Sequence, residues 1–353
     1  LLGSDKLTWE KSYKTNIGLE MMLWGKLNLT LDYYWERRKD ILIQRSSLPS
    51  MAGFDASIYA NMGEMDNKGV DANLEYQTRI GNKVGLRLFG NLTYSKNKIV
   101  FRDEPAMQYA YQKSEGTRYG EFYGYIAEGY FQSEEEIKKS PRQMRELAPG
   151  DIKYKDLNDD GVIDANDQCY LGKSWFPSWS YGMGFNINYH NFDLALFFQG
   201  VSDVSIMANG GSIDTGNGDW GASGVGIVPF TGMGLNPSNV ITKALDRWTA
   251  DNPRADAWYP RMTANATTND NNYVNSTHWL KDGSYLRLKQ ASLGYTLENK
   301  KLMDKGIEYL YFYLSGQNLL TFSKFKLWDP ELGSNGAKYP LSRMVTLGMR
   351  VSF

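Results

Sequence analysis

An acidic segment near the middle of the chain carries the residue types of a calcium-binding loop. Residues 156–167 read DLNDDGVIDAND and fit the pattern D-x-[DN]-x-[DN]-G-x5-[E/D]. Oxygen-bearing side chains occupy the first, third and fifth positions, and Gly161 allows the sharp turn that follows them. The predicted ligands are Asp156, Asn158, Asp160, the backbone carbonyl of Val162, Asp164 through a water molecule, and Asp167.

The chemistry expected of this segment is structural Ca²⁺ binding rather than catalysis. Calcium takes about six to eight oxygen ligands, and carboxylates crowded into one short loop repel one another when no cation is present. Asp167 is shorter than the glutamate usual at the twelfth position, which lowers the affinity or admits one more water molecule. The alternative interpretation is a solvated acidic turn that only matches the pattern.

The composition leaves little for catalysis or for nucleic-acid binding. The chain has 39 Lys and Arg against 40 Asp and Glu, which gives no basic surface for nucleic acid. Cys169 is the single cysteine, so neither a disulfide framework nor a cysteine-based zinc site is possible. His190 and His278 are the only histidines. Because no sequence motif combines a nucleophile with a general base, we expect no enzymatic activity.

Long segments of alternating apolar and polar residues flank the acidic loop and must position it. One of them places Leu29 and Leu31 on one face and Thr30 on the other. Helical patterns are confined to two short segments, 133–139 and 240–250. Nine segments fit antiparallel strands: 11–24, 27–42, 68–80, 83–95, 179–189, 192–200, 284–297, 307–321 and 339–353.

The two faces of these strands differ in charge. Over the seven clearest segments the apolar faces hold no charged residue, whereas the opposite faces hold acids and bases such as Asp32, Glu75 and Arg87. These segments are 13–23, 27–35, 70–80, 84–94, 179–189, 192–198 and 345–353. A Lys or Arg facing lipid at mid-depth costs roughly 2–4 kcal/mol, so an uncharged face is expected of a surface that contacts a membrane. A soluble β-sandwich also keeps charge off its core faces, and the charge pattern alone therefore leaves both folds open.

Strand length and loop lengths distinguish the two folds. The strands run about 10–12 residues, roughly twice the usual length in soluble proteins. Short and long connections alternate along the chain, as in transmembrane barrels. The short ones are 25–26, 81–82, 190–191 and 298–306, and the long ones are 42–67, 96–178, 200–283 and 322–340. We therefore predict an all-β fold, a transmembrane antiparallel β-barrel with long extracellular loops. The 96–178 loop would contain the EF-hand or dockerin-like calcium loop 156–167, and 200–283 would form a second long extracellular loop.

The odd number of strands predicts that residues 1–353 are the C-terminal part of a larger barrel. Bacterial barrels have an even strand count, and an open edge in lipid leaves backbone groups unpaired. If the short turns are periplasmic, the ninth strand runs inward and leaves Phe353, the C-terminus, on the periplasmic side.

Several short runs resemble the SusC/RagA branch of the TonB-dependent outer-membrane transporters. Each run is weak alone, and their order and spacing together are specific to the family. The resemblance covers essentially the whole chain. The runs are Leu7–Glu10, Asp32–Tyr34, Asn67–Val70, Phe122–Tyr125, Gly129–Gln132, Asp282–Leu288, Gly316–Leu320, Asp329–Glu331 and Pro340–Phe353.

The resemblance implies a 22-stranded barrel with an N-terminal plug, of which this chain supplies the last nine strands. It also implies a multi-pass protein of the outer membrane of a Gram-negative bacterium. The implied partners are outer-membrane lipid, a SusD-like lipoprotein that covers the extracellular loops, and TonB, contacted through the N-terminal part that is absent here. The implied function is TonB-dependent import of an oligosaccharide or a peptide.

Aromatic residues are numerous, and their places suggest two roles. Those near strand ends are expected in the girdles at the membrane interfaces: Trp24, Tyr33, Tyr94 and Tyr189. Those in the long loops are candidates for stacking on sugar rings or for packing against the lipoprotein: Trp220, Trp258 and Tyr259.

Two other functions remain open from the sequence. One is a passive porin, whose selectivity depends on a constriction and fixed charge. The other is a secreted, calcium-braced adhesin or carbohydrate-binding module that never contacts a membrane.

Overall fold

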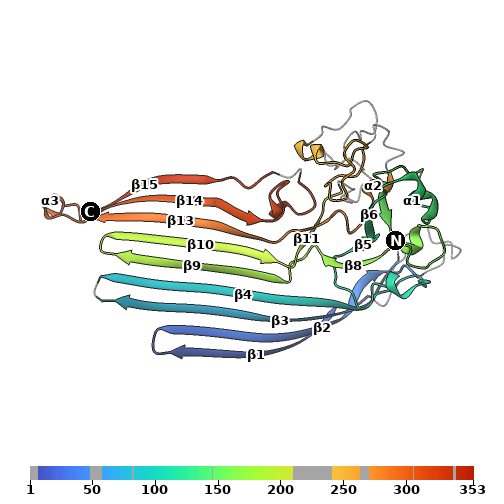
Figure 1. The fold of residues 1–353 in the computed structure, drawn as a ribbon. Helices are drawn as coiled ribbons and strands as arrows, with labels where there is room; N and C mark the ends of the chain where they lie inside the picture. Colours follow the sequence, from blue (N-terminus) through green and yellow to red (C-terminus); the bar gives the residue numbers. More distant parts are fainter. Residues whose placement is uncertain are drawn as a thin grey trace.

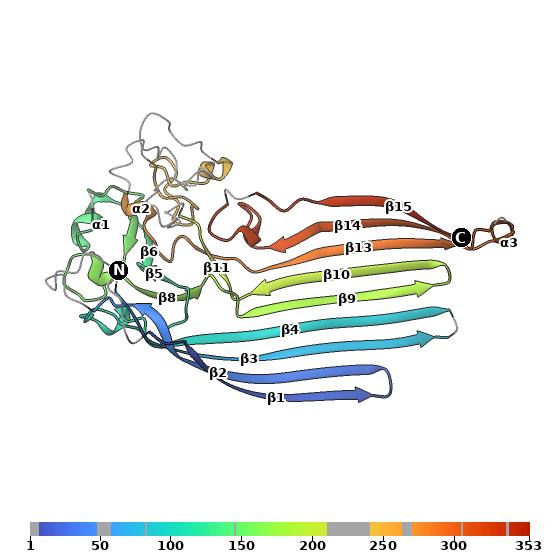
Figure 2. The same ribbon diagram turned by 180° about the vertical axis from the view of Figure 1, so that it is seen from behind.

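Nine long antiparallel strands form a single sheet, and the long connections between them gather at one of its ends (Figures 1 and 2). The computed structural model describes residues 7–47, 58–81, 83–144, 146–209, 241–262, 270–304, 306–336 and 339–353. The strands of the sheet are β1 (Lys11–Leu23), β2 (Leu27–Gln44), β3 (Tyr59–Ile80), β4 (Val84–Phe101), β9 (Trp179–Tyr189), β10 (Phe192–Ser202), β13 (Tyr285–Leu297), β14 (Tyr309–Ser323) and β15 (Met344–Ser352).

The sheet is a meander in which each strand pairs with the next one along the chain. Its order is β1-β2-β3-β4-β9-β10-β13-β14-β15, and all neighbours are antiparallel. The nine predicted strands are therefore confirmed. Two starting points were wrong, because β3 begins at Tyr59 rather than 68 and β15 begins at Met344 rather than 339. The early part of β3 still pairs with neighbours, as Met65 does with Ile99 of β4.

Tight turns close the hairpins at the end of the sheet away from the long loops. Trp24 and Gly25, between β1 and β2, have φ angles of 54° and 62°. His190, between β9 and β10, has a φ of 52°. Positive φ at these positions lets the chain reverse within two or three residues, because such turns follow the right-handed twist of the paired strands. The fourth turn is longer and contains the helix α3 (Lys300–Met303).

The long connections carry short elements of their own. The predicted helix at 133–139 is confirmed as α1 (Glu134–Lys139), with Ser133 as its N-cap. Within 241–250 the chain forms only a 3₁₀ turn, η4 (Thr242–Leu245), rather than the helix predicted for 240–250. The remaining elements are β5 (Glu121–Gly124), β6 (Ala127–Tyr130), β7 (Ile152–Tyr154), β8 (Cys169–Ser174), β11 (Ser205–Met207), β12 (Leu280–Asp282), α2 (Asp270–Tyr273), η2 (Ala110–Gln112), η3 (Ala165–Asp167) and η6 (Pro330–Leu332).

None of the helices in the described ranges has the length and apolar character needed to cross a bilayer.

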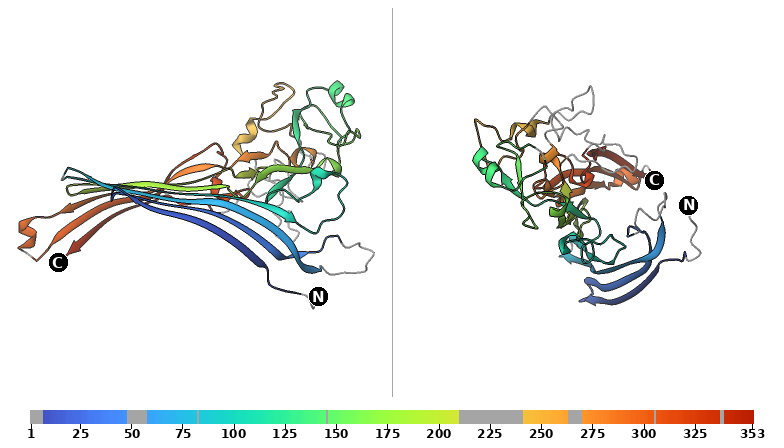
Figure 3. Two further views of the ribbon diagram at one scale, coloured as in Figure 1. Left: turned by 90° about the horizontal axis from the view of Figure 1, so that it is seen from below. Right: turned by 90° about the vertical axis from the view of Figure 1, so that its right-hand side faces the viewer.

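The main buried core lies in the loops and not in the sheet. Tyr154, Tyr259 and Trp279 are at most 1% exposed and belong to one hydrophobic cluster. The Nε1 atom of Trp279 donates a hydrogen bond to the carbonyl of Asn272 at 2.7 Å, so the buried indole is satisfied. Because these residues come from both long loops, the loops fold together as one body beside the sheet, which itself curves as an open arc (Figure 3).

Candidate functional site

The register of the strands places apolar residues side by side on one face of the sheet. Leu31 of β2 lies opposite Leu19 of β1 and Ala72 of β3. Near the other edge, Leu347 of β15 lies opposite Leu314 of β14. Leu31 is 39% exposed and Leu347 is 81% exposed, so the described chain leaves this face uncovered. An apolar face of this extent needs a partner, and the hydrocarbon of a membrane is one that matches its lack of charge.

The apolar face ends in aromatic residues and then in charges as it approaches the long loops. The rings of Tyr94 and Trp179 lie with their centroids 4.4 Å apart. Beyond Trp35, on the same face, the Nε atom of Arg37 lies 2.7 Å from the Oδ1 atom of Asp66. This sequence of leucine, aromatic and ion pair along a strand is the one expected where hydrocarbon gives way to headgroups and water.

Aromatic residues also border the apolar face at the turn end. Trp24 is 81% exposed and Tyr189 is 49% exposed. Phe192 and Tyr295 lie across neighbouring strands with their ring centroids 4.7 Å apart. Together with Tyr33, which is 49% exposed near the loop end, these residues fit the two predicted aromatic girdles.

The opposite face of the sheet is polar, and several of its charged side chains bond to residues of other strands. Arg87 donates two hydrogen bonds to Glu75, from Nε to Oε1 at 2.9 Å and from Nη2 to Oε2 at 3.0 Å. The hydroxyl of Tyr311 donates to the Oδ2 atom of Asp193 at 3.1 Å. Cross-strand pairs of this kind stabilise a sheet whose face contacts water or a polar domain rather than lipid.

A shallow hollow of about 580 Å³ lies on the polar face, over β3, β4, β9 and β10. Its lining is rich in amides and hydroxyls, including Asn73, Asn91, Thr93, Ser180 and Gln199. Such groups both donate and accept hydrogen bonds, so they suit a polar ligand or the backbone of a packed domain.

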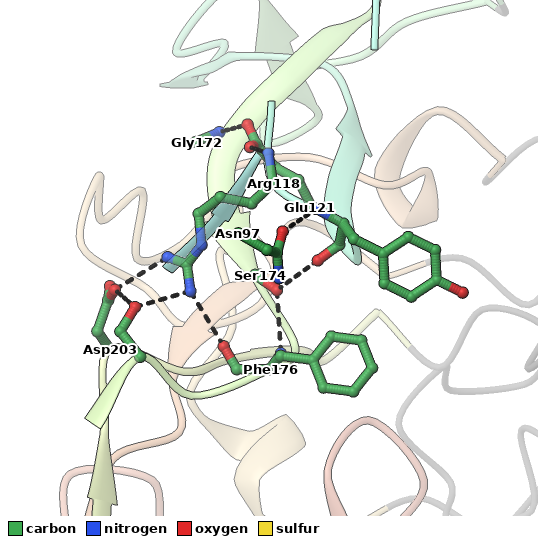
Figure 4. Close-up of polar contacts among 9 residues, drawn as sticks. Asn97, Arg118, Glu121, Gly172, Ser174, Phe176 and Asp203 are labelled. Atoms are coloured by element: carbon green, nitrogen blue, oxygen red, sulfur yellow. Dashed lines mark hydrogen bonds and ion pairs between the residues drawn. The ribbon is translucent and has the colours of Figure 1, made fainter. Parts of the chain in front are cut away.

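Arg118 fastens the long connection between β4 and β9 to the ends of two strands (Figure 4). Its guanidinium donates hydrogen bonds to Asp203 Oδ2 at 2.9 Å and to Ser178 Oγ at 2.8 Å. Ser178 directly precedes β9 and Asp203 directly follows β10. Asn97 of β4 accepts a further hydrogen bond, at 2.7 Å, from the backbone N–H of Tyr119. No local pattern predicts this role for Arg118, because Asp203 lies 85 residues further along the chain.

The predicted calcium loop forms a tight turn in which carboxylates accept hydrogen bonds from backbone N–H groups. Asp156 accepts them from Asp159 at 2.7 Å and from Gly161 at 2.8 Å. Asp160 accepts one from Val162 at 2.9 Å. Asp159 and Gly161 have φ angles of 58° and 82°, so the sharp reversal that the pattern predicts at Gly161 is present.

The second half of the same loop is organised around Asp167. This residue is fully buried, and its carboxylate accepts hydrogen bonds from the backbone N–H groups of Leu157 at 2.7 Å and Asp164 at 2.9 Å. Asp164 in turn caps the 3₁₀ helix Ala165–Asp167 by accepting from the N–H of Asn166 at 2.7 Å. Asp156 at the first position and Asp167 at the twelfth thus each accept two backbone hydrogen bonds within the loop.

The donor set of this loop suits a hard cation, because every predicted ligand atom is an oxygen. Its acids alone do not form a metal-binding cluster: over the described ranges, no three His, Cys, Asp or Glu side chains are grouped so that they could hold an ion. The predicted set also uses the amide oxygen of Asn158 and the carbonyl of Val162. The Nδ2 atom of Asn158 donates to Asp160 Oδ2 at 2.8 Å, which places these two side chains together.

The loop aromatics proposed to contact a ligand have different fates. Tyr259 is completely buried in the loop core, so its predicted exposure to a ligand is wrong. Trp258 is half-buried and lines a cavity between the loops. Trp220 lies outside the described residues.

Comparison with known proteins agrees with this architecture. Residues 2–319 match the family model described as TonB dependent receptor-like, beta-barrel. TonB-dependent receptor P3 of Formosa agariphila is 28% identical over 379 residues, which cover 99% of this chain and 35% of that protein. TonB-dependent receptor SusC of Bacteroides thetaiotaomicron is 23% identical over 364 residues, which cover 99% of this chain and 32% of SusC.

A solved structure has the same fold over almost the whole chain. A chain of the RagAB peptide importer in its closed-closed state superposes with a TM-score of 0.73 at 24% identity, covering 99% of this chain and 36% of that one. The chain thus spans about a third of the length of the relatives that it matches. These relatives are named as receptors and an importer, not as enzymes. The chain therefore belongs to the TonB-dependent receptor β-barrel family, whose members are outer-membrane proteins, and its resemblance to SusC and RagA is confirmed.

Proposed function

We propose that this chain is the C-terminal barrel part of an importer that takes up an oligosaccharide or a peptide by a TonB-dependent mechanism. The observation that carries the proposal is the two-faced nine-stranded sheet, with one face that is apolar between its aromatic borders and one polar face. A polar face enclosed by lipid-facing strands provides a water-filled passage. The name of one relative, the RagAB peptide importer, favours a peptide as cargo, and the resemblance of the sequence to the SusC/RagA branch implies an oligosaccharide or a peptide.

In this proposal the tight turns are periplasmic and the long loops are extracellular. Outer-membrane barrels have short periplasmic turns and longer extracellular loops. Phe353 then lies on the periplasmic side, because β15 runs from the loop end toward the turn end of the sheet (Figure 1). The paired strands leave one side of β1 and one side of β15 without a described neighbour, where the other strands of the complete barrel would pair.

A SusD-like lipoprotein would bind over the long loops and hold the cargo against them. The loops offer a folded body with its own core, which is a suitable surface for a stable partner. TonB would act through the N-terminal part of the complete protein, displacing a plug from the passage whose wall is the polar face. Release of cargo into the periplasm would therefore require energy from the inner membrane.

The calcium loop would act as a brace of the extracellular body. Asp156, Asn158, Asp160, Val162, Asp164 and Asp167 would hold one Ca²⁺, which supplies charge neutralisation to the crowded carboxylates. The loop also contacts neighbouring segments, since the hydroxyl of Tyr111 donates to the carbonyl of Asn166 at 2.7 Å. Ordering this loop would therefore help to order the segments around it.

Uptake by cells that express the complete protein tests the proposal. A fluorescent oligosaccharide and a fluorescent peptide are supplied to cells with and without TonB, and the periplasmic signal is measured. We expect accumulation of one of them that is lost without TonB. Equal uptake with and without TonB would instead support a passive porin.

Fractionation tests the remaining alternative. A barrel stays with the outer membrane after a high-salt wash, and a pulldown in mild detergent should retain a lipoprotein of the SusD type. A protein found in the culture supernatant would support the secreted calcium-braced module and would contradict the transporter.

A further inference from the structure

A cavity of about 880 Å³ lies among three segments of two connections, the one between β10 and β13 and the one after β14, at the loop end of the sheet. One wall comes from η4, a second from Trp258 and the end of β12, and a third from the segment after β14. Its lining combines lysines with large aromatic rings. Its lining includes Lys243, Asp246, Trp258, Lys281, Lys326 and Trp328.

The cavity has an excess of positive charge. Four lysines and two aspartates line it. Both aspartates are already engaged, because Asp246 lies 2.8 Å from Lys243 Nζ and Asp282 lies 3.8 Å from Lys324 Nζ. Asp246 also receives a hydrogen bond from Arg254 at 2.6 Å. The carboxylates therefore do not neutralise the remaining lysines.

Lys281 is the central unneutralised cation of the cavity. Its Nζ atom donates to the carbonyl of His278 at 2.6 Å and lies 5.3 Å from the centroid of the Trp258 ring. Within the described chain no carboxylate lies within ion-pair distance of it. Burial, with a smaller effect of Lys243, lowers the pKa of Lys281 to about 8. A half-buried ammonium without a counter-ion is unfavourable, and a bound anion would remove that penalty.

The aromatic rings that line the cavity are held in place. Trp328 packs edge-on against Phe325, with ring centroids 4.8 Å apart, and its Nε1 atom donates to the carbonyl of Gly333 at 2.8 Å. Trp258 packs against Trp279 of the loop core at 5.4 Å. Fixed indole rings offer flat apolar surfaces on which a sugar ring or an apolar side chain can pack.

We propose that this cavity is a subsite for the anionic group of the cargo, with Lys281 binding the anion and the tryptophans packing against the adjacent ring or side chain. The ligand carries a carboxylate or sulfate beside an apolar surface, as an acidic saccharide or the C-terminus of a peptide does. The inference rests on the proposed import function, because it places the subsite at the end where cargo arrives. Lys326, at the exposed rim, adds long-range attraction for the same group.

Binding to the complete transporter in detergent tests the subsite with two matched pairs of probes. The first pair is an oligogalacturonate and a neutral glucan of equal length. The second pair is a short peptide with a free C-terminal carboxylate and the same peptide with a C-terminal amide. Affinities are measured by titration calorimetry for the wild type and for Lys281→Met, Lys326→Met and Lys139→Met. Lys139 is an exposed residue of α1 away from the cavity and controls for loss of one charge.

We expect the acidic member of one pair to bind at least tenfold more weakly to Lys281→Met, because one charge-assisted hydrogen bond is lost. Lys326→Met should weaken the same probe by a smaller factor and Lys139→Met should not change it. The pair that responds identifies the source of the anion, saccharide or peptide. If Lys281→Met fails to fold, the exposed Lys326→Met still decides the question.

The inference is overturned if every variant binds the acidic and neutral members of both pairs as the wild type does. In that case TonB-dependent uptake of a neutral cargo would leave the proposed import function intact. Absence of TonB-dependent uptake of any probe, with anion binding retained, would overturn the import function and leave the subsite.

Discussion

The Nη2 atom of Arg287 lies 2.6 Å from the Oδ1 atom of Asp329. Arg287 belongs to β13 and is 1% exposed on the polar face of the sheet, whereas Asp329 belongs to the connection after β14. Glu331, two residues further, lies 3.7 Å from the same guanidinium and accepts a hydrogen bond from Tyr285. The short Asp-Pro-Glu run thus fastens the last long loop to the sheet.

Replacing Asp329 by Asn should loosen this loop, because it leaves a buried guanidinium without its main counter-ion. Breaking one side of a buried pair costs about 3–5 kcal/mol, and the remaining Glu331 should keep the cost near the lower value. Hydrogen exchange of the backbone amides of residues 324–336 measures this loss of loop stability. Asp256→Asn is the matched control, because Asp256 pairs with Arg254 while 86% exposed and should change stability by less than about 1 kcal/mol. Equal effects of the two changes would contradict the role of Asp329.

Calcium should stabilise the body formed by the long loops. Free Ca²⁺ at about 100 times its dissociation constant would add roughly 2.7 kcal/mol to the stability of the segment that binds it. Protease resistance of the 96–178 loop, with calcium and with a chelator, measures this effect. Asp160→Asn should abolish the difference, because it removes a predicted ligand charge.

Asp159→Asn is the control for the calcium experiment. Asp159 lies in the same turn but is not a predicted ligand, and asparagine tolerates its φ of 58°. This variant should keep the calcium effect. Protection by calcium that survives in Asp160→Asn, or that is missing from the wild type, would contradict a site in this loop.

Acid should open the loop body through His278. Burial, with a smaller effect of Lys281, lowers the pKa of His278 to about 4, while its Nε2 atom lies 3.2 Å from the carbonyl of Trp258 and 3.4 Å from the hydroxyl of Tyr130. Between about pH 6.5 and 4 the unfolded segment binds the extra proton, so stability falls as the pH falls through this window. The loss is at most about 3 kcal/mol and is reduced by solvent screening.

Proteolysis of the segment 241–262 at a series of pH values measures this acid sensitivity. His278→Gln should flatten the profile between pH 6.5 and 4. His190→Asn, at an exposed turn whose positive φ suits asparagine, should leave the profile as it is in the wild type. A profile that is the same in His278→Gln and in the wild type would show that another group governs the transition.

Charge should be tolerated on one face of the sheet and not on the other. Leu74→Arg places a cation on the apolar face and should cost roughly 2–4 kcal/mol of barrel stability in a bilayer. Asn73→Arg, one residue earlier, points to the polar face near Asp71 and should cost far less. Urea unfolding in lipid vesicles compares the two. A smaller cost at Leu74 than at Asn73 would mean that the faces have been assigned the wrong way round.

The membrane strands could be predicted from the sequence because their two faces meet different solvents. Period-two alternation is strong only where one face is apolar and the other polar, as at Leu29, Thr30 and Leu31. The first residues of β3, from Tyr59 onward, pair in the sheet without such alternation, and the predicted strand therefore begins too late. Water on both sides of a strand removes the pattern while leaving the backbone pairing intact.

The site residues could be predicted only where a local motif carries them. The turn at 156–167 has its characteristic spacing, and its geometry follows from neighbouring residues. Arg118 acts through Asp203, 85 residues away, and Lys281 lies against the ring of Trp258 in another segment; single-sequence patterns contain no trace of such contacts. Tyr259 is predicted to contact a ligand but is completely buried, because an aromatic residue in a long loop can also form the core of that loop.

The proposed function requires that lipid contacts the face that carries Leu31 and that water or a polar domain contacts the face that carries Thr30. Nitroxide labels at these two positions, in the complete protein reconstituted into bilayers, measure it directly. Collision rates with lipid-dissolved oxygen should be high at Leu31 and low at Thr30, and a depth series through Leu29 and Tyr33 should pass through a maximum. Low oxygen accessibility at Leu31, equal to that at Thr30, would place this face inside a soluble protein and contradict the transporter.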